Sequence, residues 1–287
     1  MTSKNYLTIY AKSFNWSGFF LPKKIYFKCS VLYDFCRTID NIADQNADLE
    51  IKKKELKEFQ IKFEKNNKED IVIKNMQNLM NETNISKKIV DDLFDGVNSD
   101  LKKEVRIKTE KELLVYSYRV AGTVGLMMAK IFGIKKRETL QRAIDLGIAM
   151  QLTNIARDVV EDEKKNRIYL IKNSKDIFED IKNTISKADS FYDSSFEGIK
   201  DIPISCRFSI IVARRVYRQI GRKILKKKNI VSYREAGKIY VSNFGKIIQT
   251  IFSLFDLVVL FFIEPKKHKK ENEYNLINED ISLNERI

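Results

Sequence analysis

The sequence predicts an all-α protein, and three observations lead to this class. The 287 residues include only 10 glycines and 3 prolines, and no proline stands between Pro22 and Pro203. A β-rich chain of this length would need many turns, which favour glycine and proline. Apolar residues recur at helical spacing in long runs. Because 44% of the residues are hydrophobic, we expect a sizeable core in one large domain.

The expected helices follow one another along the chain. Residues 23–44 carry aromatic and aliphatic side chains at helical spacing, and residues 49–70 form a charged helix with a narrow apolar stripe. Next come a short capped helix (81–100), two long apolar helices (110–134 and 138–165), a helix end with a loop (187–203) and a basic helix (203–228). The polar tail, residues 266–287, is expected to be disordered beside a folded domain of residues 1–265.

The most apolar segment, residues 247–263, allows two interpretations. It is shorter than the about 20 residues that a membrane-spanning helix needs, and Asp256 interrupts it. The simpler interpretation is a helix of the core. The other is a helix whose outer side touches a bilayer, because the "KKHKK" that follows it suits an anionic lipid surface.

Charge and composition limit the possible chemistry. A net charge of +14 favours anionic partners such as phosphorylated metabolites, an acidic membrane surface or nucleic acid. The one histidine, His268, nearly excludes histidine-based catalysis and histidine-ligated zinc. Three cysteines without metal spacing suggest a reducing compartment, and residues 1–20 lack the apolar region of a signal peptide. We expect a cytoplasmic protein, peripheral at the inner face of the membrane if residues 247–263 touch lipid.

Two of the expected helices carry acidic pairs. Asp40 and Asp44 stand four apart in "YDFCRTIDNIAD", and Asp158 and Asp162 stand four apart in "QLTNIARDVVEDEKKNRIYL". Positions four apart share one face of a helix. If the two faces meet in a cavity, four carboxylates converge, and buried unpaired carboxylates are costly unless a divalent cation binds them. Ligands that are all oxygen favour Mg²⁺, with Mn²⁺ as an alternative.

Polar neighbours extend both acidic faces. Tyr33 and Arg37 continue the first face, and Gln151 and Asn154 continue the second. A diphosphate also needs cationic and hydroxyl donors. Such donors within the two motifs are Arg37, Arg157, Arg167 and Tyr169. The alternative is that both faces are simply solvated, because like charges four apart cost only about 0.2–0.5 kcal/mol on an exposed helix.

Five segments resemble the squalene/phytoene synthase family of head-to-head prenyl synthases. In chain order they are "KSFNWSGFFLP" (12–22), "YDFCRTIDNIAD" (33–44), "YSYRVAGTVG" (116–125), "QLTNIARDVVEDEKKNRIYL" (151–170) and "ARRVYRQI" (213–220). Five matches in family order are far more specific than one D-x-x-x-D motif. The departures are Asn41, where the family often has a second aspartate, and Asn166 and Ile171, where many members have glycine and proline.

The resemblance implies a fold and a reaction. It implies a single-domain isoprenoid-synthase helical bundle that encloses a central cavity with two facing aspartate-rich motifs. Mg²⁺ ions would stabilise the departing diphosphate as Lewis acids. An allylic cation would then be attacked by the second substrate, giving a cyclopropylcarbinyl diphosphate and finally a head-to-head hydrocarbon. The metal ligands carried over by resemblance are Asp40, Asp44, Asn154, Asp158 and Asp162.

The resemblance also assigns substrate contacts. Tyr33, Tyr118 and Tyr217 match cavity tyrosines, whose oxygens or rings can stabilise carbocations. Ordinary packing is the alternative for each tyrosine. Residues expected to contact the diphosphates are Ser13, Arg37, Gln151, Asn154, Arg157, Arg167 and Tyr169.

Gly18 and Ser30 bear on the length of the substrate. By resemblance they line the far end of the pocket for the isoprenoid chain, where members that use C15 substrates can carry bulky aromatics. Small residues there leave room for one more isoprene unit. This favours geranylgeranyl diphosphate as substrate and phytoene, a carotenoid precursor, as product.

Three alternatives stay open. The chain could be a squalene or dehydrosqualene synthase that uses farnesyl diphosphate, or an inactive relative that acts as an assembly factor. Such relatives usually lose the aspartates, and all four are present here. A nucleic-acid binder built on the basic residues 214–228 has no accompanying recognition motif. The expected partners are therefore the allylic diphosphate, an anionic membrane and a carotenoid desaturase that takes the product, with no nucleic acid and no nicotinamide cofactor.

Overall fold

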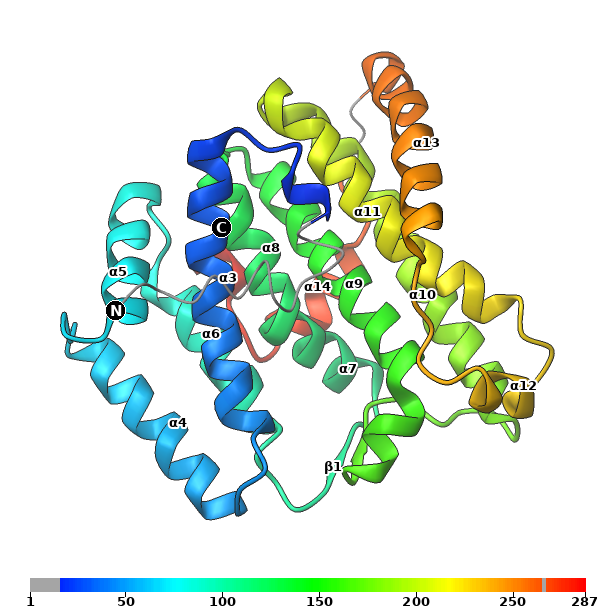
Figure 1. The fold of residues 1–287 in the computed structure, drawn as a ribbon, viewed down its shortest axis with the longest axis horizontal. Coiled ribbons are helices and arrows are strands. Elements are labelled where there is room, and N and C mark those ends of the chain that lie inside the picture. The colour runs from blue at the N-terminus through cyan, green and yellow to red at the C-terminus, as the bar shows by residue number, and fades with distance from the viewer. Residues whose placement is uncertain (1–15, 265–266) are drawn as a thin grey trace.

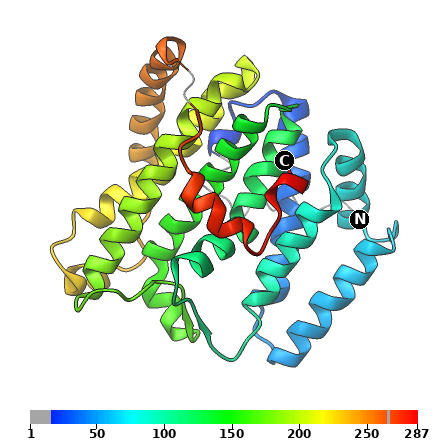
Figure 2. The ribbon, with the colours of Figure 1, turned by 180° about the vertical axis from the view of Figure 1, so that it is seen from behind.

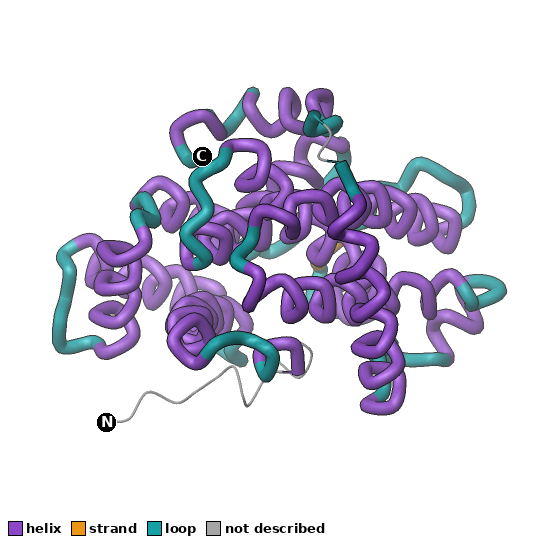
Figure 3. Tube along the Cα trace, turned by 90° about the horizontal axis from the view of Figure 1, so that it is seen from above, coloured by secondary structure: helices purple, strands orange, loops and turns teal. Residues whose placement is uncertain are grey.

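The computed structural model describes residues 16–264 and 267–287, and helices make up nearly all of their regular structure (Figures 1 and 3). The helices that build the fold are α3 (Lys23–Asp44), α4 (Leu49–Glu64), α5 (Ile71–Thr83), α6 (Lys87–Ser99), α7 (Glu110–Ser117), α8 (Thr123–Ile131), α9 (Arg137–Lys164), α10 (Ile177–Gly198), α11 (Ile204–Leu225), α12 (Ile230–Glu235), α13 (Asn243–Phe262) and α14 (Glu271–Asn278). Two short parallel strands, β1 (Val105–Arg106) and β2 (Arg167–Ile168), pair with each other. The all-α prediction is confirmed.

The long helix α9 lies at the centre of the bundle, in contact with α8, α10 and α11 (Figure 1). Two glycines allow α8 and its preceding turn to approach α9 closely. A β-carbon added to Gly125 would lie 2.2 Å from the carbonyl oxygen of Ala143, and one added to Gly147 would lie 2.2 Å from that of Ala121. Glycine at both positions is therefore a requirement of helix packing.

A π-helical segment, Tyr118–Gly122, joins α7 to α8. Residues 110–131 thus form one nearly continuous helix, as the apolar run 110–134 predicts, but with one wide turn in its middle. Such a turn changes which face the following side chains occupy, and it often occurs at functional sites.

The C-terminal segment differs from the disordered tail that its composition predicts. The helix α14 and the short turn Leu283–Glu285 pack across the back of the molecule (Figure 2). The segment buries Tyr274, Ile277, Ile281 and Leu283. The segment is ordered despite its polar composition, because its few apolar residues face the protein while the charged residues between them face outward.

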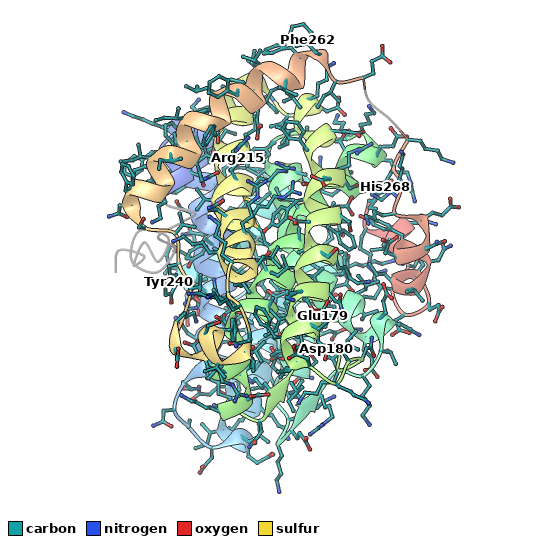
Figure 4. The ribbon with its side chains drawn as sticks, turned by 90° about the vertical axis from the view of Figure 1, so that its right-hand side faces the viewer. Glu179, Asp180, Arg215, Tyr240, Phe262 and His268 are labelled. Atoms are coloured by element: carbon teal, nitrogen blue, oxygen red, sulfur yellow. The ribbon has the colours of Figure 1, made fainter. Side chains whose placement is uncertain are left out.

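Buried polar contacts anchor this segment as well. Arg286 donates two hydrogen bonds to the Asp92 carboxylate of α6, at 2.9 and 3.0 Å. The Tyr274 hydroxyl donates to Asp145 of α9 at 3.0 Å, and His268 Nε2 lies 2.8 Å from the same carboxylate. Figure 4 places His268 on the side where α14 lies. The segment therefore ties α6 and α9 together.

Candidate active site

The first acidic pair lies in the last turns of α3, which begins after Pro22 and ends at Asp44. Burial raises the pKa of Asp40 to about 7, while Arg37 opposes this shift and the negative charge of Asp44 adds to it. Asp44 is more exposed and is paired with two cations. Arg167 Nη1 lies 3.0 Å and Lys165 Nζ 3.7 Å from its Oδ1.

The second acidic pair lies at the C-terminal end of α9. Arg157 donates two hydrogen bonds to the adjacent Asp158, at 2.7 and 2.5 Å, and Lys238 Nζ lies 3.3 Å from that carboxylate. Burial raises the pKa of Asp162 to about 7, and the negative charge of Asp158 adds to the shift. Lys238 was not predicted from the sequence, because it lies in a loop that comes close to Asp158 only in the folded chain.

Asp100 and Arg167 lie between the two acidic pairs. Asp100, just after α6, lies near enough to both Asp40 and Asp162 for its negative charge to raise the pKa of each. Arg167 follows α9 in sequence and bonds Asp44 of α3. The β1–β2 pairing holds this stretch in place, since the Val105 N–H donates to the Asn166 carbonyl at 3.0 Å. The expected facing of the two motifs is therefore present.

The four carboxylates do not form a ready-made cluster. Among residues 16–264 and 267–287, no three acidic, histidine or cysteine side chains are grouped closely enough to hold a metal ion. Asp44 and Asp158 are instead neutralised by arginine and lysine side chains. Arg157 and Arg167, which the sequence assigns to diphosphate, bind these carboxylates.

The donor atoms nevertheless fit a hard divalent cation. The Oδ1 atom of Asn154 is buried without a hydrogen-bond partner in the described part of the chain, while its Nδ2 lies 3.4 Å from Gln151 Oε1. Asp40 and Asp162 are half-buried carboxylates, and their raised pKa values show that the charged forms are disfavoured. A bound cation satisfies an orphaned amide oxygen and stabilises buried carboxylates. Oxygen ligands of this kind suit Mg²⁺.

A pair of stacked tyrosines adjoins the acidic pairs. Tyr116 and Tyr169 have ring centroids 4.7 Å apart, and their hydroxyls donate to Asp100 at 3.0 and 2.7 Å. Burial raises the pKa of both tyrosines and of Asp100. Sequence analysis identified Tyr169 but missed Tyr116 and Asp100. Tyr116 opens the "YSYR" motif and could have been found there, whereas no motif marks Asp100.

Tyr118, the tyrosine that sequence analysis chose from that motif, lies elsewhere. It is fully buried, and its hydroxyl donates at 3.1 Å to Asp92, the carboxylate that Arg286 also binds. Residues two apart on a helix point roughly 200° apart. The structure therefore replaces Tyr118 by Tyr116 as the tyrosine of this motif that faces the acidic pairs.

Tyr33 of α3 and Tyr217 of α11 lie close to the acidic pairs, as expected. Burial raises the pKa of Tyr33 to about 12, and its titratable neighbours include Arg37, Tyr217 and Asp40. Burial also raises the pKa of Tyr217, whose charged neighbours are Arg157 and Asp158. Both phenols are therefore neutral at physiological pH, and they connect the first motif to the second.

The residues proposed to close the chain pocket are both buried. Ser30 donates its hydroxyl to the Tyr26 carbonyl at 2.9 Å. Gly18 lies in the corner before α3, where the neighbouring Ser17 carbonyl accepts a hydrogen bond from Ser209 of α11 at 2.8 Å. Ser13 lies outside the described residues, so its proposed contact with diphosphate stays a prediction.

Comparison with known sequences points to one family. The family model for squalene/phytoene synthase matches residues 7–174. The 15-cis-phytoene synthase of Paracoccus sp. is 38% identical over 171 residues, which cover 54% of this chain and 55% of that protein. The enzyme of the same name from Enterobacter agglomerans is 39% identical over 139 residues, or 42% and 47% of the two chains. The chain thus spans about half the length of these curated relatives.

Comparison with solved structures agrees. A dehydrosqualene synthase crystallised with a ligand has a TM-score of 0.71 and 27% identity, covering 88% of this chain and 94% of that one. The squalene synthase HpnC from Alicyclobacillus acidocaldarius, at 19% identity and a TM-score of 0.62, covers 82% and 92% of the two chains and shares the fold. With its family-model match and its facing acidic helices, the chain belongs to the squalene/phytoene synthase family.

Proposed function

We propose that this protein is a phytoene synthase. It would join two geranylgeranyl diphosphates head to head in the presence of Mg²⁺, through a cyclopropyl (prephytoene) diphosphate, and release diphosphate in carotenoid biosynthesis. The observation that carries the proposal is that Arg167, just after the second acidic motif, bonds Asp44 of the first, in a chain similar to proteins named phytoene synthase.

The acidic helices would hold the metal and the diphosphates. The candidate Mg²⁺ ligands are Asp40, Asp44, Asn154, Asp158 and Asp162. When bound, Mg²⁺ supplies the positive charge that stabilises diphosphate as a leaving group. Arg157 uses its Nε and Nη2 atoms on Asp158, so its remaining N–H groups can donate to a phosphate oxygen. Arg37 lies near Asp40, Arg167 pairs with Asp44, and Gln151 contacts Asn154, so each stands beside a candidate metal ligand.

The tyrosines would act on the isoprenoid cation. Tyr33 and Tyr217 are held neutral by burial and present oxygen lone pairs and ring faces. Tyr116 and Tyr169 are fixed by Asp100, so their orientation does not have to be established when substrate binds. No protein nucleophile is required, and the departing diphosphate can accept the proton that is lost.

A second candidate function is dehydrosqualene synthesis from farnesyl diphosphate. The structural similarity to a dehydrosqualene synthase, at 27% identity, favours it specifically. Analysis of the hydrocarbon product separates the two functions. With either product, the proposal includes a cytoplasmic protein with peripheral contact to an anionic membrane, and with hand-over of the apolar product to a carotenoid desaturase.

We expect activity to require Mg²⁺ or Mn²⁺, because every candidate ligand is an oxygen atom and such sites select hard cations. Turnover should stop in excess chelator and return when Mg²⁺ is restored. Hydrocarbon formation from radiolabelled diphosphate measures this. Full turnover in excess chelator would contradict the metal site.

Two tyrosine variants distinguish a role in catalysis from a role in the stability of the core. Tyr116→Phe is expected to lower turnover about a hundredfold, because it removes a hydroxyl oriented beside the acidic pairs. Tyr118→Phe is expected to keep near-normal turnover and lose about 1 kcal/mol of stability, the usual contribution of one buried hydrogen bond. Turnover at saturating substrate and urea unfolding give both values. Reduced turnover in Tyr118→Phe together with near-normal turnover in Tyr116→Phe would assign the catalytic role to Tyr118.

Gly18→Phe is expected to suppress the C40 product and to keep or raise the C30 product. A C20 chain has five more carbons than a C15 chain, so housing them contributes roughly 3–4 kcal/mol at about 0.8 kcal/mol per buried CH₂. A phenylalanine that fills this space would reject the longer chain through strain. The C40:C30 ratio from mixed substrates measures the effect, with the exposed Lys24→Phe as control. An unchanged ratio in Gly18→Phe would remove the physical support for C20 selection.

A further inference from the structure

The polarity of α13 is reversed relative to an ordinary surface helix. Its buried residues are Lys246, Gln249, Ser253 and Leu260, three of which are polar. Ten of its large apolar side chains are 45% to 82% exposed, among them Phe255 and Phe262. Helices on water-soluble proteins turn their apolar side inward. The core-helix interpretation of residues 247–263 is therefore wrong, since only 22% of the most apolar window of α13 is buried.

Polar contacts fix which side of α13 faces outward. Arg215 of α11 donates two hydrogen bonds to Asp256, at 2.5 and 2.6 Å (Figure 4 shows Arg215 beside α13). The Trp16 indole N–H donates to Thr250 at 3.0 Å. Asp256, which interrupts the apolar run in the sequence, thus lies on the inner side and leaves the outer side without a charge. A rotation of α13 to hide its apolar side would break these contacts.

The same contacts decide how α13 can meet a membrane. Its 20 residues are long enough and apolar enough to span one. However, it packs along α11, and its buried residues run from Lys246 near one end to Leu260 near the other (Figure 1). A helix attached to the protein along its length lies in the plane of the membrane interface, as amphipathic surface helices do.

Aromatic and basic residues are also exposed in the corner before α3. Phe19 is 78% exposed, and Phe20 packs edge-on against Phe208 of α11, with ring centroids 4.9 Å apart. Lys23 and Lys24 follow them and are exposed. These two lysines line a hollow beside α5, so the electrostatic attraction to anionic headgroups comes from the net charge of +14. By contrast, the "KKHKK" tail contributes less than expected, because His268 binds Asp145 and Lys270 binds Glu273.

We propose that the outer face of α13 is a surface that docks on an anionic lipid bilayer. The α13 helix lies parallel to the membrane, with its phenylalanines below the headgroups. This inference gives the membrane contact of the proposed function a surface and an orientation, and it rests on the proposed function only in that an apolar hydrocarbon product needs a lipid phase to enter.

Flotation with vesicles tests the surface. Wild-type protein should float with phosphatidylglycerol-containing vesicles at low salt. The double variant Phe255→Ser/Val259→Ser should bind at least about tenfold more weakly, because two apolar side chains leave the interface. Its thermal unfolding should match wild type, since the two side chains are 62% and 49% exposed. The matched control Ile51→Ser/Ile71→Ser, which changes exposed side chains of α4 and α5, should float as wild type.

Several results would overturn the proposal. Wild-type protein that stays unbound at low salt, or two double variants that float equally well, would remove α13 from the membrane. A dimer in sedimentation that Phe255→Ser/Val259→Ser dissociates, without flotation of wild type, would assign the face to a second copy of the chain. Asp158→Asn, which is expected to be inactive, should still float, so failure of the docking surface and failure of the proposed catalysis are distinguishable.

Discussion

Asp158→Asn and Asp40→Asn are each expected to reduce turnover at least about a hundredfold, the usual scale for losing a group that stabilises charge in the transition state. The amide keeps the size of the side chain but loses the negative charge that holds a cation. At position 158 it also leaves Arg157 without its acidic partner, whereas Lys238 keeps its ion pair with Glu161 at 2.6 Å. Hydrocarbon formation at saturating Mg²⁺ and substrate measures the loss.

Asp48→Asn is the matched control for these two variants. Asp48 is exposed just beyond the first motif, and its side chain makes no cap hydrogen bond to α4. We expect near-normal turnover in this variant. Near-normal turnover in Asp40→Asn or Asp158→Asn, with circular dichroism showing an intact fold, would mean that the motif concerned is only a charged helix face.

Arg286→Ala is expected to lower the free energy of unfolding by about 3 kcal/mol, because it leaves a buried carboxylate without its charged partner. Asp92 is 4% exposed and, among residues 16–264 and 267–287, would keep only the hydrogen bond from Tyr118. Urea unfolding monitored by circular dichroism measures the change. A loss of this size would show that the C-terminal segment contributes to the stability of the folded domain.

The neighbouring ion pair supplies the control for Arg286→Ala. Glu285 pairs with Lys88 at 2.6 Å, with both side chains more than half exposed. Exposed pairs contribute about 0–1 kcal/mol, so Glu285→Ala should change stability little. Equal losses in Glu285→Ala and Arg286→Ala would show that the segment lies on the surface without bracing it.

The helices of the bundle could be predicted because their apolar residues repeat with the helical period. The run 138–165 corresponds closely to α9, which spans Arg137–Lys164. The C-terminal segment could not be predicted, because a short polar stretch with a few apolar residues carries no strong periodicity. Its order depends on partners such as Asp92 and Asp145, which lie far away in the sequence.

The acidic pairs could be predicted because spacing alone places Asp40 with Asp44, and Asp158 with Asp162, on common helix faces. Asp100 and Lys238 could not, since only tertiary structure brings them to those faces.

The orientation of two helices also depended on the fold. The choice between Tyr116 and Tyr118 depended on which faces α6 and the C-terminal segment occupy. The outward side of α13 depended on Arg215, whose bond to Asp256 is not visible in the pattern of either helix.

Incubation of the purified protein and Mg²⁺ with the C20 and C15 allylic diphosphates separately, followed by chromatography of the hydrocarbons, tests phytoene synthesis most directly. We predict a C40 hydrocarbon from geranylgeranyl diphosphate, with at most lesser use of farnesyl diphosphate, because a hydrophobic pocket rejects a shorter chain only weakly. Formation of C30 hydrocarbon alone, or of no hydrocarbon from either substrate, would contradict the assignment.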